Sequence, residues 1–87
     1  MSYEVYLTPQ AQKDAKKILK THLKQKVIEL IETIKKDPFA YPPKYEILQG
    51  ALRGKISRRI NKQHRLVYEV LEDKKAIKIY RMWTHYE

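Results

Sequence analysis

The stretch 55–70 constrains the fold most, because its apolar residues alternate with polar ones in two short runs. The first run, K-I-S-R-R-I, places Ile56 and Ile60 on one face, and the second, R-L-V-Y-E-V, alternates in the same way. Alternation with a period of two predicts strands with one packed face and one face free for chemistry. The polar turn Asn61-Lys62-Gln63 joins the two runs, so the stretch predicts a β-hairpin.

The predicted hairpin is strongly basic. Its cationic and titratable side chains are Lys55, Arg58, Arg59, Lys62, His64 and Arg65. The whole chain carries 19 Lys and Arg against 10 Asp and Glu, a formal net charge of +9. Such a field favours nucleic acid, an acidic protein or an anionic membrane surface as a partner. A solvated basic face explains the hairpin as well, so charge alone leaves its function open.

The length of 87 residues predicts one small domain over residues 1–87. No apolar run approaches the roughly 18 residues that a membrane span needs, and the N-terminus lacks a signal-peptide pattern. Cysteine is absent, which excludes disulfides and thiol catalysis and disfavours a zinc site. We therefore expect a cytoplasmic protein without a membrane partner, a metal or a cofactor.

Two helices are predicted in the N-terminal half. Thr8-Pro9 has the pattern of an N-cap followed by proline at the first helical position. Apolar residues recur at helical spacing over residues 10–20 and again over residues 23–36, with a joint at Thr21-His22. Asp37-Pro38 ends the second helix, because the residue before a proline is disfavoured in the helical region.

Further strands are predicted on both sides of the hairpin. They cover residues 3–7, 44–48 and 76–83, and the turn Asp73-Lys74-Lys75 makes the last strand a neighbour of the second hairpin strand. The order of strand, two helices and three or four strands predicts an α+β fold. In it, a pair of N-terminal helices packs on a twisted antiparallel sheet.

Metal-free acid–base chemistry is the kind of catalysis that the sequence leaves open. No P-loop, dinucleotide loop, zinc motif or EF-hand occurs, and His22, His64 and His85 lack the spacing of metal ligands. A nuclease without a metal needs a base, an acid and cations that stabilise the phosphate. RNA supplies its own nucleophile, the 2′-hydroxyl. Glutamate, arginine and histidine on one face could therefore cleave RNA unaided.

The run S-R-R-I-N-K-Q-H-R-L-V-Y-E-V resembles a specific signature. Together with Asp37-Pro38-Phe39, Glu46 before Leu48, and His85-Tyr86 near the end, it is similar to the YoeB/Txe branch of the RelE superfamily, the toxins of bacterial type II toxin–antitoxin pairs. The resemblance covers almost the whole chain. It implies a RelE-like, microbial-RNase-like fold and an endoribonuclease that cleaves mRNA in the ribosomal A site through the 2′-hydroxyl without a metal.

The resemblance also implies roles for single residues. Glu46 matches the general base and Arg65 matches the arginine that contacts the scissile phosphate. His85 matches the histidine proposed as general acid, and Tyr86 matches the tyrosine that shapes the site. Contacts to phosphate or to the ribosome are expected from the hairpin cations Lys55, Arg58 and Arg59. The chain departs from the pattern where Glu87 follows the His-Tyr pair and where Gln49 replaces a lysine of some relatives.

The implied partners are mRNA, the ribosome with its rRNA, and an acidic antitoxin of the YefM/Phd type. Operator DNA is implied only through the antitoxin complex, and a homodimer is left open. Two other functions stay open: a gyrase-binding toxin on a ParE-like scaffold, and a basic RNA-binding module without catalysis. Gyrase inhibitors generally lack the set Glu46, Arg65 and His85, which favours the nuclease.

Overall fold

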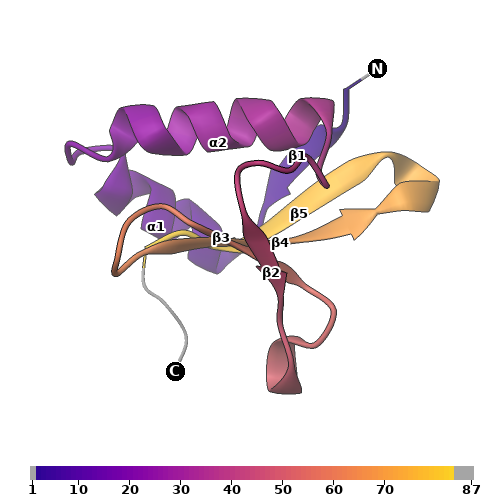
Figure 1. Cartoon of the computed structure of the whole chain (residues 1–87). Helices are drawn as coiled ribbons and strands as arrows, with labels where there is room; N and C mark the ends of the chain where they lie inside the picture. The colour runs from indigo at the N-terminus through magenta and orange to yellow at the C-terminus, as the bar shows by residue number, and fades with distance from the viewer. Residues whose placement is uncertain (1, 84–87) are drawn as a thin grey trace.

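The computed structural model describes residues 2–83 of the chain, in which five strands form one sheet and two helices cover one of its faces (Figure 1). The strands lie in the order β1-β5-β4-β3-β2. The elements are β1 (Glu4–Leu7), α1 (Pro9–Ile18), α2 (Lys24–Lys36), β2 (Tyr45–Ile47), β3 (Ile56–Arg59), β4 (Arg65–Leu71) and β5 (Ala76–Arg81), with short 3-10 helices at Gly50–Leu52 and Glu72–Lys74. This arrangement confirms the α+β fold class.

The helices begin close to where the sequence predicts and α2 ends there, but α1 ends at Ile18 rather than near Lys20. The Thr8 hydroxyl accepts a hydrogen bond from the backbone N–H of Ala11 at 3.1 Å, and Pro9 occupies the first turn of α1. Helix α2 stops before Asp37, whose backbone is extended ahead of Pro38. Within the described residues, neither helix is long and apolar enough to cross a bilayer.

The sheet is mixed, which corrects the expectation of an antiparallel sheet. Strand β1 runs parallel to β5, with Val5 opposite Ile77, whereas β2–β3, β3–β4 and β4–β5 are antiparallel. A parallel pair needs a long connection, and almost the whole chain separates β1 from β5. Strand β5 also ends at Arg81 rather than at Trp83.

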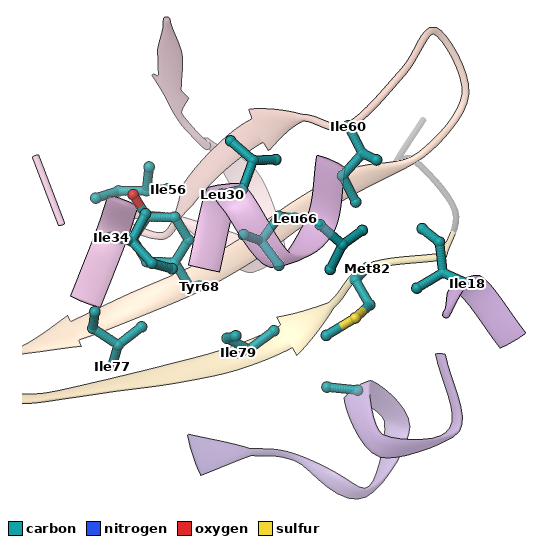
Figure 2. Packing of buried hydrophobic residues seen from close by; sticks show 12 residues of the cluster. Ile18, Leu30, Ile34, Ile56, Ile60, Leu66, Tyr68, Ile77, Ile79 and Met82 are labelled. Carbon is teal, nitrogen blue, oxygen red and sulfur yellow. The ribbon is translucent and has the colours of Figure 1, made fainter. Parts of the chain in front are cut away.

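The core lies between the helix pair and one face of the sheet. Figure 2 shows Leu30 and Ile34 of α2 beside Leu66 and Tyr68 of β4, and all four are buried together with Ile77 of β5. The alternation of the hairpin therefore predicted the packed face correctly. We call the opposite side of the sheet the far face; it carries Glu46, Ser57, Arg65 and Val67.

Candidate active site

The far face brings Glu46 and Arg65 together across strand β3, which lies between β2 and β4. Glu46 is opposite Ser57 in register, and Ser57 is opposite Val67, so their side chains share one face. Arg65 precedes Val67 by two residues and therefore points to the same face. The Arg65 Nη1 atom lies 3.7 Å from the Glu46 Oε1 atom. The general base and the phosphate-binding arginine that the resemblance implied are thus neighbours in space.

The ion pair between these two side chains is partly open to solvent. The Arg65 side chain is 25% exposed and the Glu46 side chain is 60% exposed. Exposed pairs of this kind contribute about 0–1 kcal/mol, because water screens the charges and ordering two long side chains costs entropy. Separating Arg65 from Glu46 to make room for an incoming anion therefore costs little free energy.

A pocket of about 350 Å³ adjoins the ion pair. Its lining comes from α2, the loop before β2, strands β2, β3 and β4, and the residue after β3. It consists of Lys26, Pro43, Lys44, Tyr45, Glu46, Ser57, Arg59, Ile60 and Arg65. Lys26, Lys44 and the two arginines outnumber the single carboxylate of that lining. A hollow with this balance of charge favours an anion such as a phosphate group.

Arg59 and Lys55 lie on the far face, as the alternation predicted. Arg59 is exposed, lines the pocket and stands directly opposite Arg65 in the register of β3 and β4. Like charges at directly opposite positions repel each other, and Glu46 offsets part of this repulsion through its ion pair with Arg65. An anion bound between the two guanidinium groups would relieve the repulsion.

Arg58 does not lie at this surface, which corrects its expected role in RNA binding. Its side chain is buried, and its guanidinium donates hydrogen bonds to the carbonyls of Pro38, Ala40 and Pro43 and to the Tyr68 hydroxyl, at 2.6 to 3.2 Å. These contacts use four of the five N–H groups of the guanidinium, and the buried side chain offers no surface to a phosphate. Arg58 instead ties the loop before β2 to the sheet, and so supports the strand that carries the candidate base.

Tyr80, for which the sequence pattern predicts no role, also lies on the far face. Its hydroxyl donates to Glu69 Oε1 at 2.8 Å, and the ammonium groups of Lys55 and Lys78 lie 4.9 and 5.4 Å from its ring centroid. Burial, followed by the hydrogen bond to Glu69, raises the pKa of Tyr80 above its ordinary value of 10.0. The alternation of Tyr80 with the core residue Ile79 was the available signal.

Two of the expected catalytic residues, His85 and Tyr86, lie outside the described residues, and their roles stay predictions. Within residues 2–83, no group of three His, Asp or Glu side chains is close enough to hold a metal ion.

The fold is shared with solved bacterial toxins. A YoeB/ParE toxin from Agrobacterium tumefaciens superposes with a TM-score of 0.86 at 30% identity, over 95% of this chain and 99% of that one. A chain of a YoeB–YefM complex from Staphylococcus aureus gives a TM-score of 0.81 at 34% identity, over 99% of this chain and 100% of that one. YafQ from Escherichia coli, at 21% identity and a TM-score of 0.81, has the same fold.

The sequence comparison identifies a narrower family than the shared fold does. The family model of the YoeB-like toxins of bacterial type II toxin–antitoxin systems matches residues 3–86, and the chain belongs to this family. Toxin YoeB of Mycobacterium bovis is 47% identical, and Toxin YoeB of Escherichia coli K12 is 45% identical, each over 49 residues or 56% of this chain. The match spans 58% of the length of each of these relatives. The resemblance drawn from the hairpin signature is thus confirmed.

Proposed function

We propose that this toxin is a metal-independent endoribonuclease that cleaves mRNA in the ribosomal A site and thereby inhibits translation. The observation that carries the proposal is the contact between Glu46 and Arg65, 3.7 Å apart beside a basic pocket. Cleavage through the 2′-hydroxyl needs a base next to a cation that binds the phosphate. Membership of the YoeB-like toxin family supports the same reaction.

In the proposed reaction, Glu46 removes the proton of the 2′-hydroxyl, and the resulting oxygen attacks the adjacent phosphorus. Arg65 binds the phosphate through its planar guanidinium, and Arg59 and Lys44 add positive charge at the pocket. The bond from phosphorus to the 5′-oxygen breaks as the new bond forms. By the family resemblance, His85 then gives a proton to the departing 5′-oxygen. The products are a 2′,3′-cyclic phosphate and a 5′-hydroxyl.

The proposed partners follow from charge and from the relatives. Solved structures describe a YoeB–YefM complex and a YoeB dimer from Staphylococcus aureus. For this chain we propose an acidic antitoxin of the YefM/Phd type, since a net charge of +9 attracts an acidic partner. The ribosome and mRNA place the proposed activity in the cytoplasm. Contact with operator DNA is proposed only through the antitoxin complex.

The test compares the full-length protein with Glu46→Gln in a translating extract, where cuts in a defined mRNA are mapped. Loss of a general base is expected to lower the cleavage rate by about 100-fold or more without changing the melting temperature. Glu29→Gln is the matched control, because Glu29 is an exposed carboxylate on α2 outside the pocket. Full cleavage by Glu46→Gln would refute the role of Glu46.

The same experiment separates the other two functions. Cuts within codons that disappear without ribosomes support the endoribonuclease alone. Binding of RNA without any cut would indicate a basic RNA-binding module. Inhibition of DNA gyrase, measured as loss of supercoiling of a plasmid in the absence of cuts in mRNA, would indicate a ParE-like toxin.

A further inference from the structure

The far face contains a buried hydroxyl that folding does not explain. Ser57 is 2% exposed, and its Oγ atom has no hydrogen-bond partner in the part of the chain that the structure describes. Buried polar groups are almost always paired, because a hydroxyl that loses water without gaining a partner destabilises the fold. An alanine would fill nearly the same space without this penalty.

Ser57 lies at the centre of the candidate site. It belongs to β3, directly opposite Glu46 in register, and β3 lies between the strands that carry Glu46 and Arg65. The ion pair between those two side chains therefore crosses β3 on the face to which Ser57 points. All three residues line the same pocket.

The lining of the pocket explains why the hydroxyl has no acceptor. Lys44, Arg59 and Arg65 carry only hydrogen-bond donors, so none of these side chains can accept from Ser57. The one carboxylate of the lining, Glu46, faces Arg65 instead. The Ser57 hydroxyl lacks an acceptor oxygen, and one that enters this pocket must tolerate the surrounding cations, which describes a phosphate oxygen.

We propose that the Ser57 hydroxyl donates a hydrogen bond to a non-bridging oxygen of the scissile phosphate. This inference rests on the proposed endoribonuclease function. The RNA separates Arg65 from Glu46, Arg65 turns to the phosphate, and the hydroxyl beneath the former ion pair gains its acceptor. Ser57 neither forms a covalent bond nor gives up its proton. It orients the phosphate and holds part of the negative charge that develops in the transition state.

The first test measures the stability of full-length Ser57→Ala without RNA. Removing an unpaired buried hydroxyl is expected to leave the melting temperature unchanged or to raise it. Thr33→Ala is the control, because the Thr33 hydroxyl on α2 has a partner, the Glu29 carbonyl at 2.9 Å. A melting temperature of Ser57→Ala several degrees below that of the wild type would mean that the fold uses the hydroxyl, and would overturn the inference.

The second test measures cleavage by ribosomes programmed with short mRNAs that carry sulfur in place of either non-bridging oxygen at the scissile phosphate. Ser57→Ala is expected to lower kcat by about tenfold or more on the normal mRNA, the scale of one hydrogen bond to a charged group. Sulfur accepts hydrogen bonds weakly, so one of the two thio-substrates should slow the wild type by a similar factor. Ser57→Ala should lose little further on that substrate, because the contact is already absent.

The outcomes separate this inference from the proposed function. If the wild type cleaves mRNA, and Ser57→Ala equals it in kcat and in sensitivity to sulfur, the role of Ser57 is refuted and the function stands. If the wild type makes no ribosome-dependent cut, the proposed function fails and the role of Ser57 fails with it. Slower cleavage by Ser57→Ala at unchanged stability, with the combined loss smaller than the product of the two single losses, supports the inference.

Discussion

At the scale of single residues, the neighbouring arginines Arg58 and Arg59 have opposite environments. Arg58→Ala would remove the donor to the Ala40 and Pro43 carbonyls and to the Tyr68 hydroxyl, so we expect the free energy of unfolding to fall by about 3 kcal/mol or more. Arg59→Ala removes an exposed cation and should change it by less than about 0.5 kcal/mol. Urea unfolding followed by circular dichroism measures both variants. Equal stabilities would contradict the assignment of Arg58 as a structural residue.

The case of Arg58 shows what the sequence could predict at this scale and what it could not. The alternation placed position 58 on the same face as Ile56 and Ile60, and both isoleucines are buried as expected. The residue type instead predicted an exposed side chain, because arginine is rarely buried without partners. The partners are backbone carbonyls of the loop 38–43. The path of that loop over the sheet could not be read from its composition.

The Tyr68 hydroxyl predicts a pH dependence of stability. It donates to the Pro38 carbonyl at 2.6 Å and accepts from Arg58 Nε at 2.9 Å, and burial raises its pKa above 10.0. Above about pH 10 the unfolded chain loses a proton that the folded chain keeps, so the free energy of unfolding falls as pH rises. The stability advantage over Tyr68→Phe, about 1 kcal/mol at neutral pH, should therefore shrink above pH 10. Urea titrations at pH 8, 9.5 and 10.5 measure the difference, and a constant difference would contradict this account.

At the scale of elements, Asp14 connects α1 to the end of β5. Its carboxylate is buried and accepts hydrogen bonds from the Met82 backbone N–H at 3.0 Å and from Gln10 Nε2 at 2.9 Å. Asp14→Ala should lower the free energy of unfolding by about 2 kcal/mol, because the buried N–H loses its acceptor. Cleavage should fall as well, since Met82 precedes the expected acid His85 by three residues. Thermal unfolding and the cleavage assay test both effects.

The control for this prediction is Lys13→Ala, an exposed neighbour on the same helix, which should leave both measurements near the wild-type values. An Asp14→Ala protein with wild-type stability would show that the contact between α1 and β5 contributes little. Loss of cleavage at unchanged stability would instead assign Asp14 to the active site.

The elements themselves were largely predictable, but their arrangement was not. The cap at Thr8 and the stop at Asp37 are local signals, and both hold. The order of strands depends on contacts between distant segments, so the parallel pair of β1 and β5 had no local signal. Simple alternation also put Met82 on the side of Tyr80. A register shift between β4 and β5 at Val67 interrupts the alternation, and Met82 is buried in the core.

At the scale of the whole molecule, the net charge of +9 identifies a class of partners but not a site. Lysines spread over both helices and arginines at the pocket contribute to the same field. The candidate base and its arginine became neighbours only through the register of three strands. The family signature in the sequence identified these two residues. Their contact, and the position of Ser57 beneath them, follow only from the folded sheet.

The contribution of the pocket cations and that of the overall positive field can be separated by the salt dependence of RNA binding. For a short RNA that 2′-O-methyl groups protect from cleavage, log Kd measured by fluorescence anisotropy should rise linearly with log salt, by about 0.7 per phosphate neutralised. Arg59→Ala removes a cation of the pocket and should lower this slope by about 0.7 to 1. Lys36→Ala removes the same charge from an exposed position on α2 outside the pocket and should leave the slope unchanged. Equal slopes in the two variants would show that the overall field, rather than the pocket, binds the RNA.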